Sequence, residues 1–301
     1  MIGAAFGFLP TDSFNVVVLV AVFVLISLGL HFTFGLLNVV NLMHGEFLLL
    51  GAYTAFEIQS RTGNVVLGML VAPIVGALIG VAVERGVLRV LYERPLDSLL
   101  ATFGLSVIIR QVVQLVYSAN PRSVDDPIGG SFLLLGLNVP WWRLVVVIVT
   151  IGLVALVSWL LTRTSFGLRA RATVRNPVLA AAMGIKVGPT RATLFAIGAG
   201  LTALAGAILA PLNTLDPQYG LLFLVNAFLV VILGGQGSLR GLVIAAVILG
   251  GSLSVMQFTI SSVIAQIVVI VIAVVAVRLR PVLVRALAER RERRATAAAG
   301  A

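Results

Sequence analysis

The sequence contains no cysteine and only two histidines among its 301 residues. Without cysteine, neither a disulfide bond nor a thiolate metal site can form. His31 and His44 are too few for a histidine-based metal cluster, so we expect no metal ion and no cofactor on this chain. A phosphate loop is excluded as well, because the G-x-x-x-x-G-K-S/T pattern is absent and the only lysine is Lys186.

Charged residues are also scarce, at 11% of the chain, whereas hydrophobic residues make up 60%. A soluble domain carries about 25% charged residues, so this much apolar surface needs lipid as its solvent. Residues 14–34 contain no charge, and 21 residues at about 1.5 Å each cross a hydrocarbon core of about 30 Å. The net charge of +10 does not indicate a nucleic-acid partner, because the arginines fall between the apolar runs and in the tail.

Long apolar runs recur along the whole chain. They predict an all-α, polytopic transmembrane helical bundle of about eight or nine spans, with broken or re-entrant helices and a weak two-half internal repeat. The predicted spans are 14–34, 36–57, 65–90, 98–118, 144–162, 191–210, 219–234, 239–257 and 262–279. The run 219–234 is short for a span, so it is the one most suited to a re-entrant helix.

The basic residues predict the orientation of the bundle. With the N-terminus outside, the loops 84–97, 163–191 and 235–240 and the tail from Arg278 place 17 of the 21 lysines and arginines inside. Only three lie outside, and Arg110 falls within a predicted span. The positive-inside rule therefore predicts a plasma (inner) membrane protein with its N-terminus outside and its C-terminus in the cytoplasm.

One polar segment interrupts the apolar pattern near the start of the second predicted span. Asn38, Asn41, His44 and Glu46 lie within nine residues, with apolar runs on both sides. A charge at mid-bilayer costs about 2.5–3.5 kcal/mol, so Glu46 must find partners in protein or water. In a continuous helix Asn38, Asn41 and Gly45 share one face. We expect these side chains either to line a substrate pathway or to form a hydrogen-bond network that fixes helix packing.

A weak repeat adds Asn226 to the candidate pathway. The run Gly35–Asn41 (GLLNVVN) resembles Gly220–Asn226 (GLLFLVN), with the final asparagines in step. Transporters are often built from two such halves, with the substrate site between them. A path lined by amides, hydroxyls and one buried acid suits a small neutral polar solute, because it offers no net charge to trap an ion.

The inner loop 163–191 contains a short predicted helix. Asn176 is a good N-cap, Pro177 suits the first helical position, and Gly184 is a good C-terminal stop. Val178, with Leu179 and Ala182, forms an apolar face that either lies on the membrane surface or docks into a groove on a partner. The residues expected to make that contact are Arg169, Arg171, Asn176, Leu179, Ala182 and Gly184. Residues 1–285 are predicted to form a single transmembrane domain, and 286–301 a basic, disordered cytoplasmic tail.

Several of these runs resemble one family. Gly35–Tyr53 (GLLNVVNLMHGEFLLLGAY) looks like the N-x-x-H-G-E-F-x-x-x-G-A-Y signature of the branched-chain amino acid and urea permeases of ABC transporters. Arg163–Ile185 is similar to the loop of those permeases that contacts the ATPase. Arg94–Ser106 (RPLDSLLATFGLS) looks like the R-P-L-E-T-L-L-A-T-W-G-L-S run of the urea permease. The resemblance covers residues 15 to 285 and is closest to the urea permease.

The resemblance implies a permease subunit of an ATP-driven importer, which is not itself an enzyme. It implies a second homologous permease chain, two ATP-binding subunits and an extracytoplasmic solute-binding protein, all assembled at a lipid bilayer. ATP hydrolysis would then occur on the partner chains, and the inner loop would transmit the nucleotide-driven motion.

The solute implied is urea or a short amide, with branched-chain amino acids as the alternative. A zwitterion needs both an acidic and a basic partner, and the sequence offers only Arg110 as a membrane arginine. A passive urea or polyol channel is an alternative of another class. It is disfavoured because Asn120-Pro121 and Asn176-Pro177 are not followed by alanine, and because a passive channel needs no docking helix.

Overall fold

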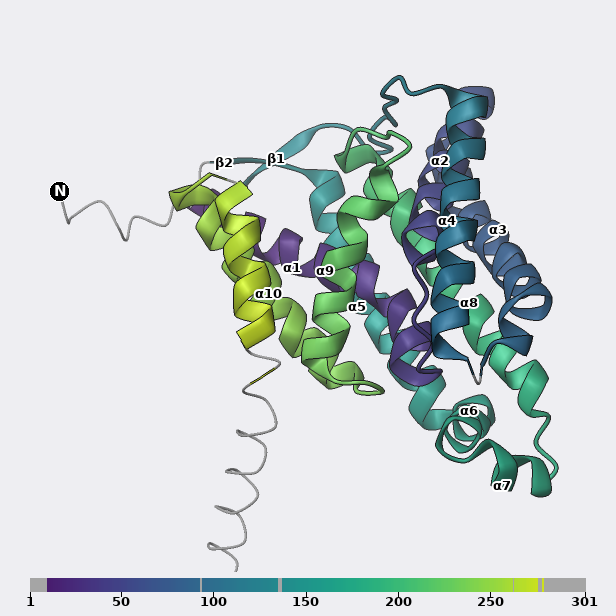
Figure 1. The fold of residues 1–301 in the computed structure, drawn as a ribbon. Helices are drawn as coiled ribbons and strands as arrows, with labels where there is room; N and C mark the ends of the chain where they lie inside the picture. The colour runs from purple at the N-terminus through teal and green to yellow at the C-terminus, as the bar shows by residue number, and fades with distance from the viewer. Residues whose placement is uncertain (1–9, 93, 135–136, 262, 276–277, 279–301) are drawn as a thin grey trace, which may run out of the picture.

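The computed structural model describes residues 10–92, 94–134, 137–261, 263–275 and 278. These residues form α-helices and one two-stranded hairpin, which confirms the predicted all-α, polytopic fold (Figure 1). The helices are α1 (Pro10–Leu30), α2 (His44–Thr62), α3 (Val65–Gly86), α4 (Pro95–Tyr117), α5 (Trp141–Arg163), α6 (Ser165–Arg175), α7 (Pro177–Ala182), α8 (Val187–Leu209), α9 (Tyr219–Gly234) and α10 (Leu239–Thr259). The hairpin pairs β1 (Ser131–Leu134) with β2 (Leu137–Pro140). The predicted tail 286–301 lies outside the described residues.

Six helical segments of the described chain are long and apolar enough to cross a membrane. They are Phe14–Leu36, Val65–Val90, Pro95–Tyr117, Trp141–Arg163, Val187–Leu212 and Leu239–Gln257. Two shorter apolar helices, Tyr219–Gly234 and Val263–Val275, match the predicted spans 219–234 and 262–279. The part of the chain that the structure describes thus has six helices of spanning length, and the eight or nine spans expected from the sequence stay a prediction.

Helix α8 forms the centre of the bundle and packs against α1, α2 and α3. The helix backbones approach closely because small residues lie where they cross. A Cβ added to Gly51 of α2 would collide with the backbone carbonyl of Ala203 of α8. In lipid, such close packing replaces the hydrophobic drive that holds helices together in water. Helix α4 lies alongside α2 at the edge of the bundle, with apolar side chains such as Leu100 and Leu115 exposed (Figure 1).

The second predicted span, 36–57, is wrong at its start. A π-helical segment, His31–Leu36, extends α1, and residues 37–43 are not helical. Asn38 has a left-handed backbone (φ 56°), and the Asn41 side chain accepts a hydrogen bond from the Met43 backbone N–H at 3.0 Å. Asparagine side chains that bind nearby backbone in this way compete with helix formation. Asn38, Asn41 and Gly45 therefore do not share one helix face, because α2 begins only at His44.

The two stretches of the predicted repeat have different backbones. Gly35–Asn41 contains the end of the π-helical segment and a non-helical run, whereas Gly220–Asn226 lies within α9. The glycine that meets α9 is instead Gly45, whose added Cβ would fall 2.6 Å from the carbonyl oxygen of Gly220. Helices α2 and α9 thus cross at this pair of glycines.

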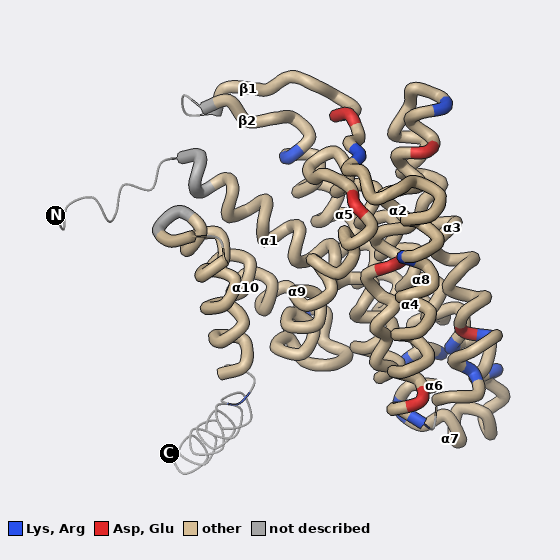
Figure 2. The backbone as a smooth tube through the Cα atoms, turned by 45° about the horizontal axis from the view of Figure 1, so that its top comes forward, with Lys and Arg blue, Asp and Glu red and all other residues tan. Residues whose placement is uncertain are grey.

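The inner loop 163–191 is more helical than predicted. Its first part forms α6, and α8 begins at Val187 and not at Arg191. The short helix α7 is confirmed, since the Asn176 side chain accepts from the Leu179 N–H at 2.9 Å. Gly184 stops it with φ 81°. The tube in Figure 2 shows lysines and arginines gathered around α6 and α7 at one end of the bundle.

Candidate functional site

Helix α4 carries a row of polar side chains at four-residue spacing, which we call the α4 seam. Its members are Ser98, Thr102, Ser106 and Arg110. Residues four apart lie above one another on a helix, so the row extends over about 18 Å of α4. The first three are buried, at 4%, 0% and 1% exposure, although α4 as a whole is largely exposed. The polar face of α4 therefore points into the protein.

Glu46, in the first turn of α2, meets the seam at its Arg110 end. Glu46 Oε1 accepts a hydrogen bond from Ser106 Oγ at 2.8 Å and from Arg110 Nη2 at 3.0 Å. Arg110 Nη2 also donates to Ser106 Oγ at 2.8 Å. The Glu46 side chain is 1% exposed and that of Arg110 is 15% exposed. Each charge compensates the other, and the positive end of the α2 dipole favours the carboxylate.

The non-helical run 37–43 contacts the seam one helical turn before this ion pair. The Leu42 backbone N–H donates to Thr102 Oγ1 at 3.2 Å, and Asn41 is fully buried. Among the described residues, Asn41 Nδ2, Glu46 Oε2 and Arg110 Nε have no hydrogen-bond partner. Buried polar atoms are normally paired, but other described residues, such as Ser27 and Tyr53, also have unpaired buried atoms, so these three do not by themselves mark a ligand site.

Polar side-chain hydrogen bonds also occur at both ends of α9. Arg110 Nη1 donates to Gln218 Oε1 at 3.4 Å, immediately before α9 begins. Asn38 Oδ1 accepts from Gln236 Nε2 at 3.0 Å, in the turn just after α9 ends. Since α9 has 16 residues, these two contacts lie about 24 Å apart along its axis. The polar side chains thus extend through most of the bundle.

Two of the predicted pathway residues lie elsewhere. His44 Nε2 is 3.3 Å from the Ile26 carbonyl and 3.4 Å from Thr202 Oγ1, so His44 packs between α1 and α8. Asn226 Oδ1 accepts from Gln266 Nε2 at 2.8 Å and does not meet Asn41. The structure therefore brings the Glu46 side chain to the α4 seam, whereas Asn41 binds the nearby Met43 backbone and Asn38 binds Gln236 after α9.

The α4 seam itself was not among the predicted site residues. The sequence predicts Arg110 only as an arginine within a span, and Ser98, Thr102 and Ser106 only as part of the run that resembles the urea permease. The signal was nevertheless present in the sequence, as polar residues at positions 98, 102, 106 and 110 of an apolar run. A charged residue in a span also requires a partner, and Glu46, in the predicted span 36–57, is one of the few acids within the predicted spans.

The residues predicted to contact an ATPase gather around α6 and α7. Leu179 and Val178 expose 58% and 79% of their surface, and Ala182 is also exposed. The apolar face of α7 is thus uncovered. Arg169 and Gly184 line a cavity of about 460 Å³ between α6 and α8. Arg171 differs from its neighbours, because its guanidinium donates to the Leu161 carbonyl and ties α6 to α5.

These features define the class of the protein: a multi-pass membrane transport subunit with a polar seam inside the bundle and an exposed helix at the basic end. Residues 13–277 match the family described as "Branched-chain amino acid transport system / permease component". The chain belongs to this family, and it is therefore the permease subunit of an ABC-type importer of the inner membrane, which works with ATP-binding subunits and a binding protein.

Relatives from distant organisms align with most of this chain. It is 26% identical to the high-affinity branched-chain amino acid permease LivH of Escherichia coli K12 over 253 residues, 79% of this chain and 82% of that protein. The probable LivH of Methanocaldococcus jannaschii is 29% identical over 253 residues, 79% and 78%. The ribose import permease RbsC of Bacillus subtilis is 27% identical over 260 residues, 80% and 75%. No solved structure matches the chain. These relatives do not confirm the expected closeness to the urea permease.

Proposed function

We propose that the chain is the permease subunit of an importer of branched-chain amino acids, with the α4 seam as part of its substrate pathway. The observation that carries this proposal is the ion pair between Glu46 and Arg110. The expectation of a neutral solute rested on a lining of amides, hydroxyls and one buried acid, and on Arg110 as the single arginine within a predicted span. Because an acid and an arginine lie together, the seam offers both charges that a zwitterion needs.

An amino acid can exchange partners with this pair without leaving a buried charge. Its carboxylate would bind Arg110 and its ammonium group would bind Glu46, so that two ion pairs replace one. An apolar cluster adjoins the seam and suits a branched aliphatic side chain. It contains Met43 and Phe47 near α2 and, packed against them, Leu105 and Ile109 of α4.

The remaining assembly follows from the family and from the charge distribution. We propose a second homologous permease chain, two ATP-binding subunits and an extracytoplasmic solute-binding protein. The N-terminus would lie outside and the basic end, with α6 and α7, in the cytoplasm, as the positive-inside rule favours. Leu179 and Ala182 of α7 would then meet an ATP-binding subunit. The permease itself would need no cofactor, because ATP is bound by those partner subunits.

Uptake by the assembled transporter tests the proposal. The permease, its ATP-binding subunits and its binding protein are reconstituted in proteoliposomes, and labelled leucine, isoleucine, valine and urea are followed with and without ATP. We expect ATP-dependent uptake of the three amino acids and none of urea. Uptake of leucine that does not require ATP would overturn the importer assignment.

Urea remains the second candidate solute, because the run Arg94–Ser106 resembles that of the urea permease. Thr102 and Ser106, which belong to this run, lie on the α4 seam. Hydroxyls of this kind bind a neutral amide as well as they bind an amino acid. ATP-dependent uptake of urea without leucine would establish this candidate and contradict the main proposal.

A further inference from the structure

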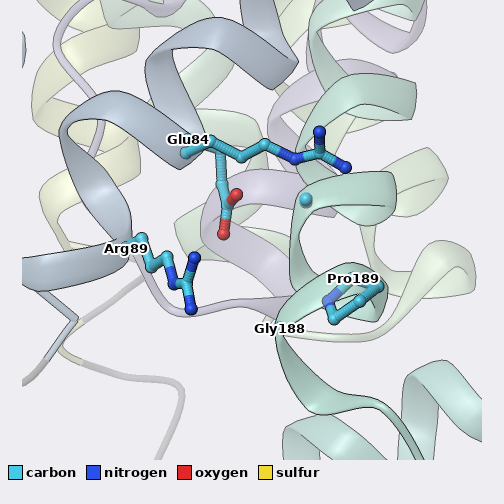
Figure 3. A pocket seen from close by; sticks show the side chains of 6 residues that line it. Glu84, Arg89, Gly188 and Pro189 are labelled. Carbon is cyan, nitrogen blue, oxygen red and sulfur yellow. The ribbon is translucent and has the colours of Figure 1, made fainter.

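A second polar site lies outside the α4 seam, at the end of α3. It is a cavity of about 330 Å³ between α3 and the start of α8. Its lining residues are Glu84, Arg85, Arg89, Gly188, Pro189 and Ala192. Figure 3 shows Glu84 and Arg89 on one side of this space and Gly188 and Pro189, from the first turn of α8, on the other. The volume is at the lower end of the range for small-ligand sites.

The cavity has two arginines that share one nearby carboxylate, Glu84, so positive charge is in excess. Glu84 is 2% exposed and accepts a hydrogen bond from the Tyr92 hydroxyl at 3.1 Å. Burial raises the pKa of Tyr92, so this hydroxyl stays protonated, and the Arg191 guanidinium covers its ring at 4.5 Å. Arg85 and Arg89 are exposed, and neither has an ion pair within 4 Å among the described residues. An anion could therefore bind between them.

An exposed apolar stripe on α3 leads to this cavity. It consists of Leu67, Leu70, Ile74 and Leu78, spaced by three or four residues. Arg85 continues the same face in the last turn of α3, and Arg89 follows in the 3-10 turn Leu88–Val90. A helix of 22 residues is about 33 Å long, so its last turn reaches the level of the lipid headgroups. In a bilayer the stripe would lie at the level of the acyl chains, and the arginines at the level of the headgroup phosphates.

We propose that the cavity at the end of α3 binds the headgroup phosphate of an anionic phospholipid between Arg85 and Arg89, with the acyl chains along the α3 stripe. Basic pockets between membrane helices bind such headgroups in this way. The apolar stripe favours a lipid over a soluble phosphate, which would gain nothing from it. The Glu84 carboxylate lies beside the site and repels the anion, so it lowers the affinity for the lipid.

The test is lipid binding to the assembled transporter, which is independent of the transported solute. The complex of permease chains and ATP-binding subunits is delipidated in detergent and titrated with phosphatidylglycerol or phosphatidylcholine, and bound lipids are counted by native mass spectrometry. We expect a saturable phosphatidylglycerol site that phosphatidylcholine does not fill. The double variant Arg85→Gln/Arg89→Gln should weaken phosphatidylglycerol binding roughly 30-fold.

Two further variants distinguish lipid binding in the cavity from general electrostatic attraction to the protein. Gly188→Leu changes no charge and fills the space, since a Cβ at Gly188 meets no atom within 4 Å, and it should also abolish saturable binding. Arg163→Gln is the matched control, because Arg163 is an exposed arginine at the end of another apolar span, and it should leave binding unchanged.

Three results would overturn the proposal. Equal phosphatidylglycerol binding by all variants would show adsorption without a site. Displacement of the lipid by millimolar inorganic phosphate would assign the cavity to a soluble anion. Binding to the isolated permease chain but not to the assembled transporter would show that another subunit covers this face.

Discussion

Glu46 and Arg110 meet at 3.0 Å although 64 residues separate them in the sequence. The contact joins the first turn of α2 to the middle of α4, which otherwise packs loosely at the edge of the bundle. Ser106 binds both partners, so the three side chains form one closed unit. In this unit each charge compensates the other inside the bundle.

Removing one charge should cost more stability than removing both. Glu46→Gln leaves Arg110 without its carboxylate, and Arg110→Met leaves Glu46 unpaired, so each should destabilise the protein by about 3 kcal/mol. The double variant Glu46→Gln/Arg110→Met leaves no buried charge and should recover most of that loss. Thermal unfolding in detergent measures the three variants against the wild type. Additive losses in the double variant would contradict a direct pairing.

The Thr102 hydroxyl should stabilise the non-helical run before α2 and support transport. Thr102→Val keeps the shape but leaves the Leu42 N–H unpaired, which should cost about 1 kcal/mol and lower leucine uptake several-fold. Thr150→Val is the matched control, because Thr150 is equally buried and bonds only the Val146 carbonyl in its own helix. Transport by both variants is measured at equal amounts of assembled protein. Equal uptake by the two would remove Thr102 from the pathway.

His44 should act through packing and not through the substrate. His44→Phe removes contacts with the Ile26 carbonyl and the Thr202 hydroxyl, so the melting temperature should fall by an amount equivalent to about 1 kcal/mol. The KM for leucine should not change. Thr202→Val, which removes the partner hydroxyl, should also lower the melting temperature and leave the KM unchanged. A raised KM with unchanged melting would place His44 on the pathway instead.

Helix α7 should couple the permease to ATP hydrolysis. Ala181→Pro breaks this helix at a cost of about 3 kcal/mol locally, and Leu179→Asp puts a charge on its exposed apolar face. Both should abolish substrate-stimulated ATPase activity while membrane insertion stays intact. Leu168→Asp is the control, since Leu168 is similarly exposed, at 64%, on α6. Loss of stimulation in all three variants would show that α7 has no special role.

Features with local causes could be predicted from the sequence. The spans follow from uncharged runs of sufficient length, and α7 follows from its Asn176 cap and its Gly184 stop. Helix α6 was not predicted, because its arginines led the whole of 163–191 to be assigned as a basic inner loop. Its start is nevertheless a local signal, since the Thr164 hydroxyl accepts from the Gly167 N–H at 3.1 Å.

The break before α2 and the seam depend on distant contacts, which a single sequence does not show. Asn38 takes its left-handed conformation where Gln236, 198 residues away, binds its side chain. The partner of Glu46 could be deduced only as some basic or hydroxyl group within the membrane. That it is Arg110 follows from how α4 lies on α2.

Substrate uptake by the double variant tests the central claim, that the Glu46–Arg110 pair receives a zwitterion. ATP-driven uptake of labelled leucine is measured in proteoliposomes with Glu46→Gln/Arg110→Met and with the wild type, at matched levels of assembled, folded transporter. If the pair binds the amino acid, uptake should fall roughly 100-fold, the loss of two charge-assisted contacts. Uptake within two-fold of the wild type would contradict the account and leave the pair as a structural link between α2 and α4.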